Sequence, residues 1–152
     1  MRTRSAAILI QNDSLALIER HRDGLHYFSF PGGGVDAGET PEQAVVREVR
    51  EELGVDVRVL RLAAKVWFRG NPQFFFLVEQ VGGEFGTGTG DEYASDHDPA
   101  RGSYEPVLLS LADVTANNIL PQPIAALVVA SHPEAWPAEQ TVITVGDSVC
   151  VP

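Results

Sequence analysis

The sequence predicts a single α+β domain in which a mixed β-sheet is sandwiched between helices. The length of 152 residues suits one domain with its own core, and the hydrophobic share of 44% is ordinary for a globular protein. The predicted elements follow the order strand, strand, loop, helix, strands, helix, which is typical of a sheet covered by helices. We find no internal repeat and no interdomain linker, so residues 1–152 are treated as one domain.

Most strands are predicted from runs of apolar and aromatic residues bounded by turn signals. They cover residues 5–10, 15–19, 27–30, 55–68, 74–81, 104–109 and 140–151. Turns are expected at 11–14 and 69–72, and the proline and three glycines of 31–34 predict a loop, since glycine destabilises regular structure. Residues 82–102 are rich in Gly, Asp and Ser and predict a long, mobile loop.

The clearest helix is predicted from Thr40 to Leu53. Thr40 suits the N-cap, Pro41 the first helical position, and Gln43 completes a capping box. Gly54 stands where a left-handed C-terminal cap belongs. Residues spaced by four form one apolar stripe, namely Val45, Val49 and Leu53. A second, more uniformly apolar helix is predicted over 123–131 and should pack on the sheet.

Composition argues against several classes of function. The net charge of −10 and the lack of a Lys/Arg cluster make polymeric nucleic acid an unexpected partner. No apolar run approaches the length of a membrane span, and the apolar stretch 6–10 is too short for a secretory signal. The single cysteine, Cys150, excludes an intramolecular disulfide and a cysteine zinc cluster. We therefore expect no membrane association and a cytoplasmic location.

A group of acidic residues lies within the first predicted helix. Glu48, Glu51 and Glu52 occupy positions i, i+3 and i+4, so their carboxylates share one helix face. Like charges at this spacing repel each other, and residues 39–52 hold five acids against two bases. A solvated acidic face would explain three glutamates alone. A hard divalent cation such as Mg²⁺ is the natural partner of clustered carboxylates, and the preceding glycine-rich loop would let a phosphorylated ligand approach the backbone.

The whole segment Gly33 to Val55 resembles the Nudix box. That motif is a glycine, five residues, a glutamate, seven residues and then Arg-Glu-apolar-any-Glu-Glu-any-Gly-apolar. Every defined position is matched, by Gly33, Glu39, Arg47, Glu48, Val49, Glu51, Glu52, Gly54 and Val55. The resemblance implies a Nudix hydrolase with an α/β/α sandwich and a mixed sheet.

The resemblance also implies roles for individual residues. Glu48 and Glu52 would be the leading ligands of Mg²⁺, with Mn²⁺ as an alternative, and Glu51 a further ligand or the base that activates water. Arg47 would orient these carboxylates and pair with Glu39, and the Gly33 carbonyl would join the metal shell. The reaction would be attack of a metal-activated water on phosphorus, without a covalent intermediate.

Further site residues are expected outside the box. The segment after Tyr104 resembles the one that follows an additional acid in many family members, which makes Glu105 the candidate, with Glu92 as competitor. The residues Arg20, His21, Arg22 and His26 would either bind phosphates or belong to a hydrated loop.

Aromatic side chains on the predicted strands offer rings that could stack on a base. Most must be core, and we select Phe28 and Trp67 from a set that also holds Phe68 and 74–76. His97 lies in an acidic stretch, for which we favour a surface loop over a metal site. Cys150 is too near the terminus to suggest a catalytic thiol.

Four functions are compatible with the motif. We expect a nucleoside triphosphate pyrophosphohydrolase first and an ADP-ribose or nucleotide-sugar pyrophosphatase second, for which Pro72 gives weak support. A dinucleoside polyphosphate hydrolase lacks its typical tyrosine after the box. A Nudix domain that senses nucleotides without cutting them usually loses box glutamates, and here all are present. The partner would be a small nucleotide-type molecule, and a homodimer is compatible with the sequence.

Overall fold

The computed structural model of the chain describes residues 3–89 and 102–145. The elements in chain order are β1 (Arg4–Gln11), β2 (Ser14–Arg22), β3 (Leu25–Ser29), β4 (Gly32–Gly34), α1 (Pro41–Leu53), β5 (Val55–Phe68), β6 (Asn71–Gly83), β7 (Ser103–Ser110), the 3₁₀ helix η3 (Leu111–Ala116), β8 (Ile119–Leu120), α2 (Gln122–Ser131) and β9 (Thr141–Val145). Three residues considered above, Glu92, His97 and Cys150, lie outside the described residues. Within the described part, no helix combines the length and apolar character required to cross a bilayer.

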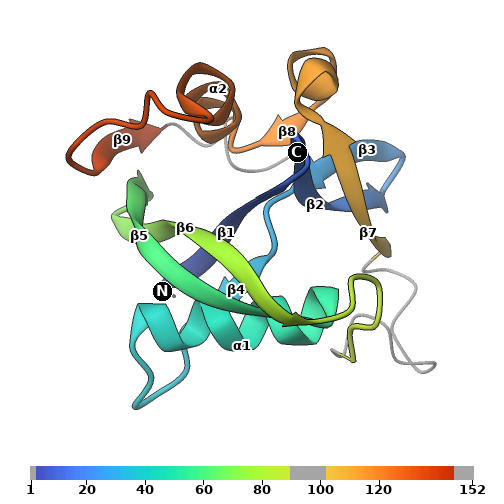
Figure 1. Cartoon of the computed structure of the whole chain (residues 1–152), viewed down its shortest axis with the longest axis horizontal. Coiled ribbons are helices and arrows are strands. Elements are labelled where there is room, and N and C mark those ends of the chain that lie inside the picture. Colours follow the sequence, from blue (N-terminus) through green and yellow to red (C-terminus); the bar gives the residue numbers. More distant parts are fainter. Residues whose placement is uncertain (1–2, 90–101, 146–152) are drawn as a thin grey trace.

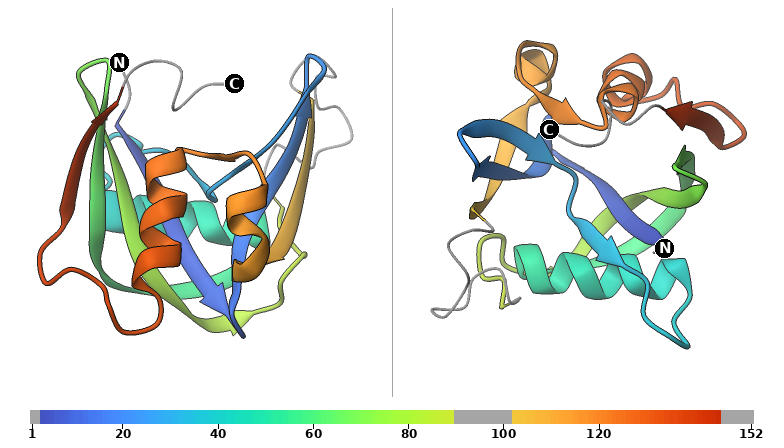
Figure 2. Two further views of the ribbon diagram at one scale, coloured as in Figure 1. Left: turned by 90° about the horizontal axis from the view of Figure 1, so that it is seen from above. Right: turned by 180° about the vertical axis from the view of Figure 1, so that it is seen from behind.

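The strands form one mixed sheet in the order β8-β3-β2-β1-β6-β5-β9, with β4 paired to β1 and β7 to β2. The pairs β1–β6, β3–β8 and β5–β9 are parallel and the others antiparallel. Helix α1 covers one face, and α2 with η3 lies on the other (Figure 1). Strand β1 crosses between the β5–β6 hairpin and the β2–β3 hairpin (Figure 2). The predicted α+β sandwich with a mixed sheet is confirmed.

Two apolar clusters hold these layers together. On one face, the predicted stripe Val45, Val49 and Leu53 of α1 is fully buried against β1, β2, β5 and β6. On the other face, Ile124 and Val128 of α2 pack on a second cluster from the same sheet. The sheet therefore carries apolar side chains on both faces, and α1 packs on one of these faces through its apolar stripe.

The ends of α1 follow the predicted chemistry. The Thr40 side chain accepts a hydrogen bond from the Gln43 backbone N–H, and the Gln43 side chain accepts one from the Thr40 backbone, so the capping box is complete. Gly54 ends the helix at φ 76°, a left-handed conformation that costs glycine little. These local contacts set the rotation and register of the helix that carries the glutamates.

The predicted loop at 31–34 is wrong in one respect, because Gly32–Gly34 forms strand β4. The strand pairs with β1, where Ser5 lies opposite Gly33. A Cβ atom on Gly32 would lie 2.3 Å from the Ser5 carbonyl oxygen, so the pairing needs a residue without a side chain. Glycine weakens a strand in general, but here it permits a backbone approach that other residues would block.

The predicted turn at 69–72 and the predicted loop at 82–102 both begin or end inside what the structure shows as strand β6. The turn between β5 and β6 consists of Arg69 and Gly70, both at positive φ, and β6 already begins at Asn71. The expected loop 82–102 begins two residues later, since Gly82 and Gly83 belong to β6. The start of this loop is bound to the end of α1, since the Glu84 N–H donates to the Gly54 carbonyl at 3.1 Å and the Gly86 N–H to the Leu53 carbonyl at 2.8 Å. The prediction of mobility for residues 90–101 falls outside the described residues.

Candidate active site

Arg47, in the middle of α1, is the centre of a polar network. Its guanidinium donates two hydrogen bonds to Glu39, at 2.8 and 3.0 Å, which is the contact expected from the sequence. It also donates to Glu48 at 3.0 Å, to Glu51 at 3.2 Å and to the Gly34 carbonyl at 3.0 Å. One planar group with five N–H donors therefore ties the loop before the helix to two of the helix carboxylates.

Glu48 and Glu52 are buried, with only 9% and 6% of their surface exposed. Both meet the glycine strand β4. The Glu52 carboxylate accepts a hydrogen bond from the Gly32 N–H at 2.9 Å. A Cβ atom on Gly33 would lie 2.4 Å from an oxygen of Glu48, so only glycine leaves room for that carboxylate. The glycines thus place two acids, one turn apart on α1, against a backbone edge.

Glu51 lies apart from this pair. Its side chain is 42% exposed, and its carboxylate is held by Arg47 at the rim of the site. It does not line the pocket into which Glu48 and Glu52 project. Of the three predicted carboxylates, those of Glu48 and Glu52 are therefore buried together, while that of Glu51 faces solvent beside them.

The charges of the network reinforce one another. Hydrogen bonds from the Arg47 guanidinium, and next from the Asp36 backbone N–H, lower the pKa of Glu39 from 4.5 to about 2. Hydrogen bonding to Glu39 in turn raises the pKa of Arg47 above its ordinary value, although partial burial opposes this. Both groups are therefore fully charged across the physiological pH range.

This network predicts an acid-dependent contribution to stability. The pKa of Glu39 is lower in the folded than in the unfolded chain, so its contribution is complete above about pH 4.5 and is lost as the pH falls toward 2. We expect Glu39→Gln to lower the free energy of unfolding at pH 7, and the difference from the wild type to shrink between pH 4.5 and 2. Urea denaturation across this range measures it. A difference that stays constant with pH would contradict the prediction.

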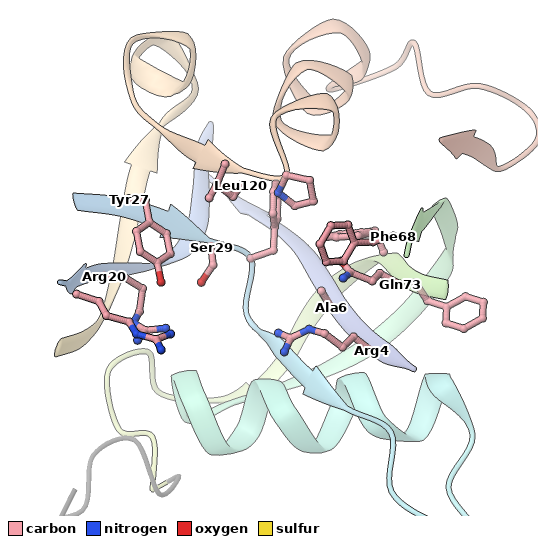
Figure 3. A pocket seen from close by; sticks show the side chains of 13 residues that line it. Arg4, Ala6, Arg20, Tyr27, Ser29, Phe68, Gln73 and Leu120 are labelled. Atoms are coloured by element: carbon pink, nitrogen blue, oxygen red, sulfur yellow. The ribbon is translucent and has the colours of Figure 1, made fainter. Parts of the chain in front are cut away.

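The buried carboxylates open into a pocket of about 250 Å³. Its lining includes Glu48, Glu52, the three glycines of β4, Arg4, Arg20, Phe30 and Tyr104. A second pocket of about 320 Å³ shares Arg4, Arg20, Ser29 and Phe30 with it and continues toward the β5–β6 turn. The two pockets therefore form one cleft, acidic at α1 and basic and aromatic farther on. In Figure 3 the side chains of Arg4 and Arg20 reach into the space above α1 from different sides.

The β2–β3 hairpin separates the four predicted phosphate-binding residues into two groups. Arg20 and Arg22 line the cleft, and Arg20 is held by Tyr104, with its guanidinium carbon 3.7 Å from the ring centroid. His21 and His26 are direct cross-strand partners, and His21 alternates along β2 with Arg20 and Arg22, so the two histidines project from the opposite face of the hairpin. The sequence grouped these residues by proximity, whereas strand alternation divides them.

The two aromatic residues selected from the sequence do not line the cleft. Phe28 is 6% exposed and belongs to the apolar cluster under α2, so it is a core residue. Trp67 is absent from the lining of both parts of the cleft, while its neighbour Phe68 lines it. Phe74 and Tyr27 line it as well. The missed Tyr27 lies directly opposite Arg20 in the hairpin, so the pairing register was the signal that would have identified it.

Glu105 is not placed with the box carboxylates. Residue 104 lies opposite Arg20 on β2, and Glu105 lies opposite Glu19. Successive side chains of a strand point to opposite faces. Since Tyr104 lines the carboxylate pocket, Glu105 projects from the other face, where it is exposed. The structure thus places Glu105 apart from the box carboxylates, outside the lining of their pocket, and Glu92 lies outside the described residues.

The donor set at α1 fits a hard divalent cation. Two carboxylates are almost removed from water, lie at one end of a cleft, and face a strand whose glycines leave the backbone accessible. Burying a carboxylate is costly unless its charge is compensated, and a cation would add to the hydrogen bonds that Glu48 receives from Arg47 and Glu52 from the Gly32 N–H. Oxygen ligands that leave space for water and phosphate oxygens are those that Mg²⁺ prefers.

Comparison with known proteins places the chain in a family. The sequence profile of the NUDIX domain matches residues 1–118, so the chain belongs to the Nudix family. This family is generally dependent on divalent metal ions.

Individual relatives cover shorter segments. An RNA pyrophosphohydrolase of Photobacterium profundum is 43% identical over 68 residues, which are 43% of this chain and 38% of the relative. An 8-oxo-dGTP diphosphatase of Escherichia coli is 38% identical over 80 residues, or 49% of this chain and 62% of the relative. The matched segments thus span less than two thirds of these relatives. The crystal structure of an ADP-ribose pyrophosphatase from Streptococcus suis is similar over 93% of this chain and 98% of that chain, with a TM-score of 0.67 and 25% identity.

Proposed function

We propose that the protein is a Mg²⁺-dependent hydrolase that cleaves a phosphoanhydride bond of a nucleoside triphosphate and releases pyrophosphate. The observation that carries the proposal is the cleft itself. Two buried glutamates at one end continue into a wall of arginines and aromatic rings. Such a cleft matches a substrate that has metal-bound phosphates at one end and a flat apolar base at the other.

Each residue group has a defined task in this reaction. Glu48 and Glu52 would hold the cation, with the Gly33 carbonyl as a further ligand and Glu51 either as a ligand or as the base that activates water, and Mn²⁺ is the expected substitute. A bound cation supplies stabilisation for the charge that develops on the phosphoryl oxygens and lowers the pKa of its bound water. Arg47 holds the carboxylates of Glu48 and Glu51 in place by hydrogen bonds.

The covalent steps need only the substrate and one water molecule. The water oxygen bonds to phosphorus while the bridging P–O bond breaks, and the bond's electron pair leaves on the departing phosphate oxygen. One proton of the water passes to a carboxylate of the box. Glu51 suits this role because it lies at the rim of the site. No residue of the chain has to form a covalent intermediate.

The far end of the cleft supports a nucleotide as substrate. Arg4 and Arg20 border both parts of the cleft, between the carboxylates and the aromatic residues, where they can neutralise phosphates that the cation does not contact. Phe68 and Phe74 provide rings beyond them. Rings of this kind stack on bases with little preference for sequence or base type.

Three alternatives follow from the relatives and the motif. The fold similarity to an ADP-ribose pyrophosphatase favours ADP-ribose or a nucleotide sugar as second candidate. The RNA pyrophosphohydrolase relatives raise a 5′-triphosphate RNA end, against which the net charge of −10 argues. A sensor that binds without cutting would not need the complete set of box glutamates that this chain has. A homodimer remains an expectation.

A substrate panel tests these possibilities. Purified protein with Mg²⁺ is incubated with nucleoside triphosphates, ADP-ribose, nucleotide sugars and a short 5′-triphosphate RNA, and products are separated by chromatography. We expect pyrophosphate and a nucleoside monophosphate from at least one triphosphate. Preferred cleavage of ADP-ribose or of the RNA would replace the proposed substrate. Tight binding of a nucleotide without turnover of any compound would establish the sensor instead.

The aromatic end of the cleft yields a separate prediction. Stacking of a base on an aromatic ring contributes about 1–3 kcal/mol, so Phe68→Ala should raise KM for the preferred nucleotide about tenfold with a smaller effect on kcat. Trp67→Ala is the matched control, because the residue is adjacent on β5 but outside the lining of the cleft. Equal effects of the two substitutions in steady-state kinetics would show that the base does not bind there.

A further inference from the structure

Two histidines and a glutamate gather on the β2–β3 hairpin, on the face that the proposed reaction does not use. His21 and His26 are direct cross-strand partners, and Glu19 lies two residues before His21 on the same face of β2. The imidazole rings stack with centroids 4.3 Å apart and an interplanar angle of 2°. The His26 Nε2 atom lies 2.6 Å from a Glu19 oxygen.

The ligand atoms of these three side chains all lie within 4.8 Å of one another. A tetrahedral ion with bonds of about 2.1 Å holds its ligands roughly 3.4 Å apart, so small side-chain rotations bring the three groups into a common shell. Among the described residues, these three side chains form the group of histidines and acids whose ligand atoms lie this close together. The backbone pairing of β2 with β3 fixes their spacing without help from a loop.

Strand β7 adds polar groups on the other side. Ser103 lies opposite His21, and its hydroxyl is 3.5 Å from the His21 Nδ1 atom. Glu105 lies opposite Glu19, and direct partners project from the same face of a sheet at Cβ separations of about 4.5–5.5 Å. Glu105 is exposed. Glu105, which does not lie with Glu48 and Glu52, is therefore positioned beside the histidine cluster.

We propose that Glu19, His21 and His26 form a second metal site, which binds a borderline transition-metal ion of the Zn²⁺ class, with Glu105 as an additional ligand. Two imidazole nitrogens and a carboxylate are ligands that suit Zn²⁺, Co²⁺ or Ni²⁺, whereas Mg²⁺ prefers oxygen ligands throughout. The cluster and the helix carboxylates thus differ in the metals they select.

The position of the site suggests its effect. Glu19 and His21 alternate along β2 with Arg20 and Arg22, which line the cleft on the opposite face. An ion held by β2 and β3, with β7 beside them, would fix the strands that present Arg20, Tyr27 and Tyr104 to the cleft. We therefore expect the bound ion to raise the Tm of the protein, since it binds only the folded hairpin.

The test uses the full chain with Mg²⁺ in excess, so that the helix carboxylates are occupied before a second metal is added. Zn²⁺ is titrated by calorimetry, and the histidine side-chain nitrogens are followed by NMR. We expect one Zn²⁺ to bind and the signals of His21 and His26 to shift, while that of His132 stays in place. Removing even an indirect partner of a metal commonly costs about 10–100-fold in affinity, so His21→Ala and His26→Ala should each weaken binding at least tenfold.

Controls separate this site from others. His132→Ala removes a histidine at the end of α2 and should leave Zn²⁺ affinity unchanged. His26→Gln retains a polar group at the hairpin and should lose affinity as His26→Ala does, and a wild-type circular dichroism spectrum shows that either variant is folded. Zn²⁺ affinity that is unchanged in the double variant His21→Ala/His26→Ala, or histidine signals that do not respond, would overturn the proposal. Because no turnover is measured, the result is independent of the proposed hydrolase activity.

Discussion

Glu52→Gln is expected to lower kcat for the preferred nucleotide by at least about 10²–10³-fold, the loss typical when one electrostatic stabiliser of a transition state is removed. The substitution keeps the shape of the side chain and its ability to accept the Gly32 N–H, but it removes the negative charge that holds the cation. Metal affinity should therefore fall while the fold is retained. Steady-state kinetics over a range of Mg²⁺ concentrations and thermal unfolding measure the two effects.

Glu42→Gln is the control for this experiment. Glu42 lies on the same helix, in its first turn, and is exposed. It should leave kcat within a factor of about two, since surface substitutions away from special features usually have small effects. Activity of Glu52→Gln equal to that of Glu42→Gln would refute the assignment of Glu52 as a metal ligand.

Arg47→Ala is expected to lower the free energy of unfolding by about 2–3 kcal/mol in metal-free buffer. Removing one partner of a buried ion pair costs about 3–5 kcal/mol, and the Arg47 side chain is 29% exposed, which reduces the effect. The loss leaves Glu39, Glu48 and Glu51 without their shared donor. Activity should fall as well, because the carboxylates would no longer be held in position.

Arg50→Ala provides the comparison one turn later on the same helix. Its guanidinium is bonded to Asp56 at 2.7 Å, but its side chain is 66% exposed, so the pair contributes at most about 1 kcal/mol. Urea denaturation of both variants gives the difference. Arg47→Lys keeps the charge without the five-donor fork and should be intermediate. Equal stability of the Arg47→Ala and Arg50→Ala variants would show that the network contributes no more than a surface ion pair.

The helix and its carboxylates could be predicted from the sequence because they depend on local chemistry. The caps at Thr40, Gln43 and Gly54 need contacts only a few residues away, and the spacing of Glu48 and Glu52 places them on one face of any α-helix. The Arg47 to Glu39 contact spans eight residues and follows from the same motif. None of these features required knowledge of which strands pair.

The rest of the site depends on pairing over long distances in the chain. The register of β2 with β3 and β7 decides that Arg20 and Tyr104 enter the cleft while His21, His26 and Glu105 project from the other face. A shift of one residue would exchange the two sets, because side chains alternate with a period of two. The sequence shows the alternation of each strand but not which of its faces meets the cleft.

What the sequence by itself determined is the chemistry at one end of the cleft: a capped helix with a complete Nudix box, and therefore the carboxylates that can hold a divalent cation. Only the tertiary structure decided what stands opposite them. It turned Gly32–Gly34 into a strand, placed Phe28 in the core and brought Phe68 rather than Trp67 to the cleft. The reason is physical, since helix contacts are made between near neighbours, whereas the sheet joins residues that only the complete fold brings together.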